Sequence, residues 1–338
     1  MFSKKILIMG PSWIGDMVMA HSLFQYLKKQ NPSVQIDVAA PSWTLPLLDR
    51  MPEVTSKIAL PFKHGQLGLM ERIHFGRSLK NKQYTQSISL VNSLKSAILP
   101  LAAGIPKRTG FLGEMRYGFL NDIRPLDKAA LPKTVERFVA LGINKEKILP
   151  AIPQPTLIAD STNAKVVLNK LGISLPNDKV LGLCPGAEYG EAKRWPVAHY
   201  AEVATAALDQ DWQVILFGSD KDISITQAIN ALSQSKCIDL GGKTKLGDAI
   251  DIMSLCDTIV SNDSGLMHIA AALDKKLIAI FGSSNPEHTP PIHPDAVIAY
   301  LALTCSPCFK RECPIEGVGH MACLNDTTPR SIINRINI

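Results

Sequence analysis

The sequence predicts an α/β protein built from two Rossmann-like domains, each with a doubly wound parallel sheet. Short β-branched and aliphatic runs alternate with longer amphipathic segments, as in sheets whose parallel strands are joined by crossover helices. A proline-rich segment near the middle of the chain interrupts this alternation, which then begins again. The length of 338 residues is that of about two domains, at roughly 100–200 residues each.

In the N-terminal half, the alternation predicts four strands. They are expected at Ile6–Met9, Gln35–Ala39, Lys57–Leu60 and Ser87–Val91. A helix is expected over Met17–Lys29, where apolar residues recur at helical spacing. Its apolar face consists of Val18, Leu23, Phe24 and Leu27.

The segment Leu149–Pro155 is the expected linker between the domains. It contains Pro150, Pro153 and Pro155, and this density of proline interrupts both helices and central strands. We therefore expect an N-terminal domain over residues 1–155 and a C-terminal domain over 156–338. The last helix is a candidate for packing back on the N-terminal domain.

After the linker, the same pattern of strands and helices returns. The strands are expected at Val180–Cys184, Gln213–Phe217, Thr258–Ser261 and Leu277–Phe281. The helices are expected at Val197–Leu208, Ile223–Leu232 and Gly265–Leu273. In doubly wound sheets, ligands bind at the carboxyl ends of the strands, so the turns that follow the strands are the places to look for chemistry.

Composition narrows the function classes. Hydrophobic residues make up 46% of the chain and charged residues 20%, which is enough apolar material for two cores. Aromatic residues are only 6%, which argues against a carbohydrate-binding module lined with stacked rings. The sequence contains no apolar stretch of the ~18 residues that a membrane span needs. Because the first apolar run is also too short for the core of a secretion signal, a cytoplasmic protein is expected.

The net charge of +6 is unevenly distributed. The stretch Lys57–Lys82 contains Glu71 as its only acid, against six basic residues: Lys57, Lys63, Arg72, Arg77, Lys80 and Lys82. It is either a solvated face or a patch for an anionic partner such as a phosphate, an acidic sugar or an anionic lipid surface. Nucleic acid is disfavoured as a partner, because the sequence has no recognised nucleic-acid module and no aromatics among these charges.

The first turn with chemical potential is Gly10–Asp16, between the first strand and the first helix. It is not G-x-G-x-x-G, and no phosphate-loop motif occurs in the sequence, which disfavours a dinucleotide fold and a phosphate-loop NTPase. Asp16 is either a helix N-cap or a functional carboxylate. A position at a helix N-terminus favours the ionised form, which suits a base or an orienting acceptor and not a general acid.

Three turns in the second half offer groups that suit a nucleotide diphosphate. The turn Pro185–Pro196 combines glycines with Lys193, a point charge for phosphate. The turn Gly218–Asp222 contains acids that either accept ribose hydroxyls or cap a helix. The segment Asn262–His268 opens an apolar helix with small polar residues, which forms an anion site, and His268 is either part of that site or structural.

Cysteine usage differs along the chain. Cys184, Cys237 and Cys256 lie in or beside apolar runs and are expected in the core. A second group has the spacing C-x2-C-x4-C-x9-C and consists of Cys305, Cys308, Cys313 and Cys323. Because this is not a standard zinc spacing, free or loosely paired thiols are favoured, and zinc binding is the alternative.

Five strings in order along the chain resemble the ADP-heptose:lipopolysaccharide heptosyltransferases. They are GPSWIGDMVM (10–19), GIPKRTGFLGEMRYGFLNDIR (104–124), CPGAEYGEAKRWP (184–196), FGSDKD (217–222) and SNDSGLMHIAAAL (261–273). The resemblance covers nearly the whole chain, and RTGFLGEMRYG indicates the branch of the family that adds the second heptose. The resemblance implies a GT-B fold, in which two Rossmann-like domains face each other across a cleft.

The resemblance also implies roles for individual residues. Asp16 matches the catalytic base of an inverting reaction that needs no divalent metal and no cofactor. The implied donor-binding residues are Gly15, Glu188, Lys193, Ser219, Asp222, Asp263, Ser264, Gly265 and His268. Among these, Lys193 matches the lysine that binds the donor phosphates, and Asp222 matches the acid that binds the ribose. The cysteine group departs from the family pattern, so catalysis by its thiols is not expected.

The implied partners are ADP-heptose and the anionic lipopolysaccharide core, with peripheral contact to the inner membrane. Basic residues of the N-terminal half are candidates for acceptor binding, namely Lys63, Arg108 and Arg116, together with Lys107. Within the family, a heptosyltransferase of different acceptor specificity is the alternative. Two rival functions also remain open: a nucleotide-sugar epimerase or hydrolase on the same fold, and a non-catalytic sugar-nucleotide sensor. The sensor would need the anion site at Ser264–His268 but would have no use for Asp16.

Overall fold

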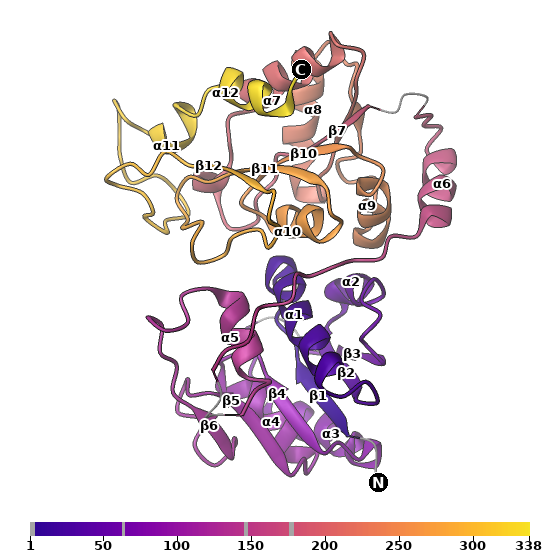
Figure 1. The fold of residues 1–338 in the computed structure, drawn as a ribbon, viewed down its shortest axis with the longest axis vertical. Coiled ribbons are helices and arrows are strands. Elements are labelled where there is room, and N and C mark those ends of the chain that lie inside the picture. The colour runs from indigo at the N-terminus through magenta and orange to yellow at the C-terminus, as the bar shows by residue number, and fades with distance from the viewer. Residues whose placement is uncertain (1–3, 63–64, 145–147, 176–178) are drawn as a thin grey trace. The chain divides into compact units, whose positions relative to one another are not determined.

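The computed structural model describes residues 4–62, 65–144, 148–175 and 179–338. The chain divides into two compact units, Met1–Pro155 and Thr156–Ile338. Within the described residues, each unit contains one six-stranded sheet, and every neighbouring pair of strands in it is parallel. The α/β class is therefore confirmed, and Figure 1 shows both sheets with helices on their two faces.

The N-terminal sheet has the strand order β3-β2-β1-β4-β5-β6. Its strands are β1 (Lys5–Met9), β2 (Gln35–Pro41), β3 (Ser56–Leu60), β4 (Gln86–Ser89), β5 (Lys107–Phe111) and β6 (Asp122–Arg124). Its helices are α1 (Ile14–Gln30), α2 (Leu45–Leu48), α3 (Leu69–Ser78), α4 (Leu94–Ala102) and α5 (Thr134–Ala140). Helix α1 packs against α5 and α3 packs against α4, on opposite faces of the sheet (Figure 1).

The C-terminal sheet has the order β12-β11-β10-β7-β8-β9. Its strands are β7 (Val180–Cys184), β8 (Gln213–Leu216), β9 (Ile238–Asp239), β10 (Thr258–Asn262), β11 (Lys276–Ile280) and β12 (Val297–Ala299). Its helices are α6 (Ser161–Lys170), α7 (Val197–Leu208), α8 (Ile223–Leu232), α9 (Leu246–Met253), α10 (Gly265–Ala272), α11 (Ala322–Asn325) and α12 (Pro329–Ile336). Figure 1 shows α7, α8 and α12 on one face and α9 and α10 on the other.

The core of the C-terminal unit is organised around Trp195 and Tyr200. Their rings pack edge to face with centroids 5.0 Å apart, and both side chains are buried. The indole N–H of Trp195 donates to the carbonyl of Thr327, 2.8 Å away, which attaches the segment before α12 to this core. Helix α12 itself packs against α7 and β11, so it belongs to the C-terminal unit.

All eight predicted strands are present, with ends displaced by at most two residues. Four further strands, β5, β6, β9 and β12, were not predicted. The predicted helices Val197–Leu208 and Ile223–Leu232 have the expected bounds, whereas α1 begins three residues earlier than predicted, at Ile14. Cys184, Cys237 and Cys256 are buried as expected. Among the described residues, no helix is long and apolar enough to cross a membrane.

Candidate active site

Each sheet has one point at which the strand order reverses, and these points locate the candidate sites. In the N-terminal sheet it lies between β1 and β4, and in the C-terminal sheet between β7 and β10. In open parallel sheets, ligands bind outside the carboxyl ends of the strands at such a reversal. The loops after β1, β7 and β10 are therefore the structural candidates, and they are the same turns that the sequence indicated.

Asp16 lies in the first turn of α1, immediately after the β1 loop, and is half-buried. The N-cap of this helix is Trp13, whose backbone is extended, so the alternative that Asp16 is the N-cap is wrong. A carboxylate in the first turn is stabilised by the positive end of the helix dipole. Gly15 precedes Asp16 in the same turn. Asp16 therefore lies at the positive end of α1, next to the strand-order reversal.

Two exposed tryptophans accompany this loop and were missed by the sequence analysis. Trp13 is 51% exposed and Trp43 is 50% exposed. The indole N–H of Trp43 donates to the carbonyl of Ser12, 3.0 Å away, which fixes that ring beside the Asp16 loop. Because aromatics make up only 6% of the chain, composition does not indicate a role for these two rings. Their signal was position, because each lies in a turn that follows a predicted strand.

Arg116, a predicted acceptor-binding residue, has a structural role instead. Its side chain is 0% exposed. Its guanidinium donates to the carbonyls of Val91 (2.7 Å) and Phe111, and to the side chains of Ser96 and Asn92 (each 3.2 Å). It thus ties the segment after β5 to the loop between β4 and α4. The acceptor-binding prediction for Arg116 does not agree with this burial.

The remaining basic candidates differ in how far their side chains are exposed. Arg108 is half-buried and donates to the carbonyls of Phe119 (2.6 Å) and Ile105 (2.7 Å). Arg72 is buried, with its guanidinium 4.1 Å from the centre of the Phe62 ring. Lys63 lies outside the described residues. Exposed charges of the basic stretch are contributed by Lys57, which pairs with Asp49, and by Arg77, Lys80 and Lys82.

The Arg116→Ala variant is expected to lower the free energy of unfolding of the N-terminal unit by about 3 kcal/mol, because it leaves buried carbonyls unpaired. Urea denaturation compared with the native protein measures this loss. The exposed Arg77→Ala variant is the control and should be close to native in stability. If Arg116→Ala instead kept native stability and raised only the KM for the acceptor, the structural assignment would be wrong.

In the C-terminal unit, Lys193 and Asp263 form an ion pair at the reversal between β7 and β10. The Lys193 ammonium lies 2.5 Å from the Asp263 carboxylate, which also accepts a hydrogen bond from the hydroxyl of Ser284 at 2.5 Å. Asp263 is 6% exposed and Lys193 is 18% exposed. A nearly buried carboxylate of this kind requires its counter-charge. Asp263 therefore fixes where the positive charge of Lys193 is held.

The scaffold beneath this pair is Asn262, at the end of β10, which the sequence analysis did not single out. Its buried amide oxygen accepts from the backbone N–H of Trp195 (3.1 Å) and from the hydroxyl of Tyr200 (3.0 Å). Its amide nitrogen donates to the carbonyl of Pro185, 2.6 Å away. Asn262 therefore joins both ends of the loop that carries Lys193 to the strand that carries Asp263. Its position next to Asp263 was the available signal.

Ser264, Gly265 and His268 share the start of α10 with this pair. Ser264 is the N-cap, and its hydroxyl lies 3.3 Å from that of Ser261. The first backbone N–H groups of a helix have no partner within the helix, and they favour an anion. His268 lies one turn further along and is 5% exposed. The sequence-predicted anion site is thus assembled from β10, α10 and the β7 loop.

His268 is uncharged at neutral pH. Burial lowers its pKa to about 4, with opposing contributions from the neighbouring charges of Asp263, which raises it, and Lys193, which lowers it. An uncharged His268 adds no positive charge to the anion site. In the ligand-free protein, the positive charge of the site comes from Lys193 and the helix dipole. A neutral imidazole still offers one N–H donor.

This low pKa predicts how stability depends on pH. The unfolded chain protonates His268 below its ordinary value of 6.5, whereas the folded chain does so only near pH 4. Its contribution to stability is therefore complete above pH 6.5 and is lost as the pH falls towards 4, by about 2 kcal/mol at pH 5. Urea denaturation at neutral and acidic pH measures it. The His268→Asn variant should lose less stability than the native protein, and an equal loss would contradict the assignment.

Asp222 and Ser219 lie after β8, beside the β7 loop. One carboxylate oxygen of Asp222 accepts from both the backbone N–H (2.9 Å) and the hydroxyl (2.7 Å) of Ser219, so the capping alternative is correct for this oxygen. A Cβ added at Gly186 would lie 2.6 Å from the Asp222 carboxylate, so only glycine permits this approach. In Rossmann-like domains, an acid in this position binds the ribose hydroxyls of a nucleotide.

Glu188 extends from the same β7 loop into solvent. It pairs with Lys221 at 2.5 Å, and both side chains are more than half exposed.

The structure brings most of the predicted donor residues of this unit to one sheet edge, at the loops after β7, β8 and β10. Gly15 is placed with Asp16 in the N-terminal unit.

Comparison with known proteins shows the family of this chain. The model of glycosyltransferase family 9 (heptosyltransferase) matches residues 72–318. The chain is 44% identical to lipopolysaccharide heptosyltransferase 2 of Escherichia coli K12, over 98% of this chain and 97% of that protein. It is 45% identical to lipooligosaccharide heptosyltransferase 2 of Haemophilus ducreyi, over 98% of both chains.

A solved structure gives the same result for the fold. The structure of the E. coli ADP-heptose LPS heptosyltransferase II matches with a TM-score of 0.87 at 42% identity, and the match covers 98% of this chain and 97% of that one. The two parallel-sheet units thus have the GT-B class of fold. The chain belongs to glycosyltransferase family 9, the heptosyltransferases, and is a glycosyltransferase.

Proposed function

We propose that this enzyme transfers L-glycero-D-manno-heptose from ADP-heptose to heptosyl-Kdo2-lipid A, in the inner core of lipopolysaccharide. The observation that carries the donor half of the proposal is the grouping of Lys193, Asp263, the start of α10 and Asp222 at one strand-order reversal. This grouping suits a diphosphate and a ribose. The names of the relatives support heptose as the sugar and the lipopolysaccharide core as the acceptor.

In this proposal, Asp16 is the base of an inverting reaction. The acceptor hydroxyl attacks the anomeric carbon as the bond to ADP breaks, and its proton passes to the Asp16 carboxylate. The transition state resembles an oxocarbenium ion, in which bond cleavage runs ahead of proton loss. A carboxylate of ordinary basicity is then sufficient, because the hydroxyl becomes acidic only as it bonds to carbon. The position of Asp16 in the first turn of α1 supports this role.

The leaving ADP is stabilised by the C-terminal unit. Lys193 supplies a full positive charge, and the N–H groups of Ser264 and Gly265 supply the positive end of α10. His268 acts as a neutral hydrogen-bond donor and not as a cation. Asp222 accepts the ribose hydroxyls with its second carboxylate oxygen, while Ser219 holds the first. The negative charge of the leaving diphosphate therefore develops next to hydrogen-bond donors that are already held in place.

We further propose that no metal ion takes part in the transfer, because Lys193 and α10 provide the counter-charge for the diphosphate. We expect the rate of transfer to be unchanged when EDTA is present in excess during the assay. The matched control is the same assay with added Mg²⁺, which should give the same rate. A clear loss of activity in EDTA that Mg²⁺ restores would contradict this mechanism.

The N-terminal unit is proposed to bind the acceptor. The exposed charges Arg77, Lys80 and Lys82 suit an anionic glycolipid and the surface of the inner membrane, and the exposed Trp13 and Trp43 rings suit sugar faces. Lys107 is half-exposed, and its ammonium forms an ion pair with the Asp122 carboxylate 3.5 Å away. We propose that the enzyme works in the cytoplasm, in peripheral contact with the inner membrane.

One assay tests the function against its two rivals. ADP-heptose is incubated with the enzyme, with and without heptosyl-Kdo2-lipid A, and both ADP and the lipid product are quantified. We expect ADP and heptosylated lipid in equal amounts, and no ADP release without acceptor. Consumption of the donor without acceptor would instead indicate a hydrolase or an epimerase. Tight ADP binding without any turnover would indicate a sensor.

A further inference from the structure

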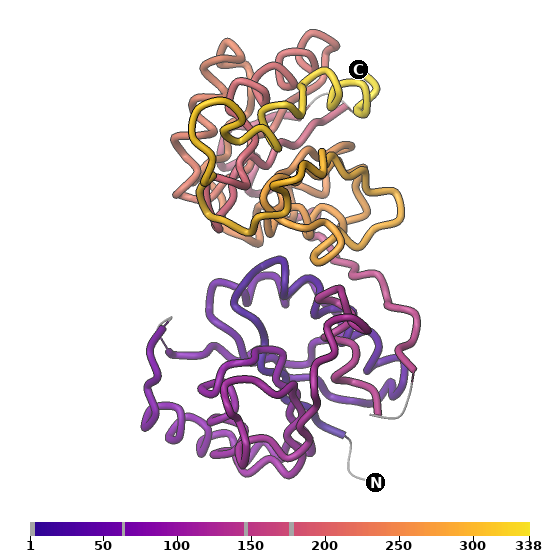
Figure 2. The backbone as a smooth tube through the Cα atoms, turned by 90° about the vertical axis from the view of Figure 1, so that its left-hand side faces the viewer, coloured from indigo at the N-terminus to yellow at the C-terminus, as the bar shows by residue number. Residues whose placement is uncertain are grey.

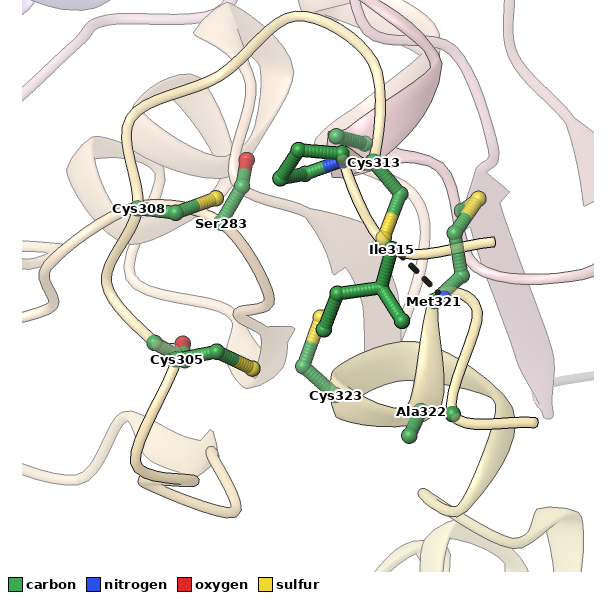
Figure 3. Close-up of a pocket in the computed structure, with 12 residues that line it drawn as sticks. Ser283, Cys305, Cys308, Cys313, Ile315, Met321, Ala322 and Cys323 are labelled. Carbon is green, nitrogen blue, oxygen red and sulfur yellow. Dashed lines mark hydrogen bonds between the residues drawn. The ribbon is translucent and has the colours of Figure 1, made fainter. Parts of the chain in front are cut away.

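Four cysteines outside the proposed donor and base residues line one small cavity in the C-terminal unit. The cavity has a volume of about 30 Å³ and is lined by Cys305, Cys308, Cys313 and Cys323, with Ile315 and Met321 among its other walls (Figure 3). All four are free thiols. A space of this size holds about one water molecule. A single metal ion would therefore also fit in it.

Three of these cysteines, Cys305, Cys308 and Cys313, lie in a segment with little regular structure, and Cys323 lies in α11, which follows it. Between β12, which ends at Ala299, and α11, which begins at Ala322, the described chain forms no helix or strand. Figure 2 shows it as a long irregular loop. Irregular loops of more than about 12–15 residues are uncommon inside compact domains unless they serve a function. This loop therefore needs another source of order.

The environment of these thiols differs from that of the core cysteines. Cys184 and Cys256 are fully buried and contribute to packing. The cysteines of the loop are exposed or half-exposed, and the backbone N–H of Met321 donates to the sulfur of Cys313 at 3.3 Å. Such N–H donors to sulfur are typical of metal-bound thiolates.

We propose that Cys305, Cys308, Cys313 and Cys323 bind one thiophilic divalent cation, zinc or iron, as a structural tetrathiolate site. Four sulfur ligands in tetrahedral geometry select these metals, and Cys305 and Cys308 have the two-residue spacing common in such sites. Among the described residues, no group of three or more histidine, cysteine, aspartate or glutamate side chains is placed so that it could hold a metal ion without rearrangement. The sulfurs must therefore turn inward, and one change of staggered rotamer moves a cysteine sulfur by about 3 Å.

The site would hold the loop against the proposed donor site, a consequence that rests on the proposed function. The carbonyl of Phe309 accepts from the hydroxyl of Tyr189 at 2.8 Å, and the carbonyl of Arg311 accepts from the N–H of Ala192 at 2.9 Å. The Tyr189 ring in turn lies 5.2 Å from the ammonium of Lys193. A Cβ added at Gly190 would lie 2.4 Å from the Arg311 carbonyl, so the two loops fit closely.

The test is the metal content of the native chain, purified without chelators from medium supplied with zinc and iron. We expect about one equivalent of zinc or iron per chain by elemental analysis. The Cys308→Ser/Cys313→Ser variant should contain less than a tenth of that amount, and the control Cys237→Ser should match the native chain. Less than a tenth of an equivalent in the native protein would overturn the site.

A second measurement needs no variant to fold. Native protein in which the metal has been exchanged for Co²⁺ should show thiolate-to-cobalt charge-transfer absorption and the visible bands of a tetrahedral ion. Bound cobalt without charge-transfer absorption would overturn the thiolate assignment. Metal-free protein with full heptosyl transfer would overturn the site and leave the proposed function standing. Protein that contains the metal but does not transfer heptose would overturn the proposed function and leave the metal site standing.

Discussion

The Asp16→Asn variant is expected to transfer heptose at least about 10³-fold more slowly than the native enzyme, a loss within the range of general-base catalysis. The amide keeps the size of the carboxylate but cannot accept the proton of the acceptor hydroxyl. Asp16 lies in the first turn of α1, after the central strand β1, where the helix dipole favours a carboxylate. The measurement is kcat for transfer at saturating donor and acceptor.

The control for Asp16→Asn is the affinity for ADP, measured by calorimetry. It should stay within a few-fold of the native value, because the proposed nucleotide site lies in the C-terminal unit. The thermal unfolding midpoint should also stay near the native value. A variant that retains a tenth of the native activity would show that Asp16 is not the base.

The Lys193→Gln variant is expected to lower kcat/KM for ADP-heptose by about 10²–10³-fold, as the loss of one preorganised charge at a leaving group does. The reason is the removal of the cation that faces the proposed diphosphate. The same change leaves Asp263, which is 6% exposed, without its counter-charge, and this costs about 3–5 kcal/mol of stability. The measurements are donor kinetics and urea denaturation.

A second substitution separates these two effects. In Lys193→Gln/Asp263→Asn, the buried charge is removed together with its partner, and Ser284 can still bond to the amide oxygen. We expect stability to return towards the native value while donor kinetics remain impaired. If the double variant recovered kcat/KM along with stability, Lys193 would serve only to neutralise Asp263.

Much of the fold could be predicted from the sequence because buried parallel strands are continuous apolar runs. The strands β1 and β7 are of this kind. By contrast, β9 and β12 have two and three residues, too few for any periodicity. The strand β5 begins with Lys107 and Arg108 and contains a glycine, so its composition resembles that of a loop.

The candidate site could be predicted only as far as residue type and turn position allow. Lys193, Asp263 and Asp222 follow strands, and parallel strands end at one sheet edge. Burial could not be predicted: the charge of Arg116 suggested an anionic partner, yet its side chain is enclosed by carbonyls of its own domain. The charge of His268 likewise depends on the packing around α10.

In the proposed reaction, the C-terminal unit holds the nucleotide and Asp16 acts on the acceptor. The binding of ADP to two variants, compared side by side, tests this division of roles. Calorimetric titration should give Asp16→Asn an ADP affinity within a few-fold of native, and should give Lys193→Gln/Asp263→Asn an affinity at least about 10-fold weaker, a loss of about 1.4 kcal/mol. Near-native affinity in the double variant, together with a large loss in Asp16→Asn, would contradict this division of roles.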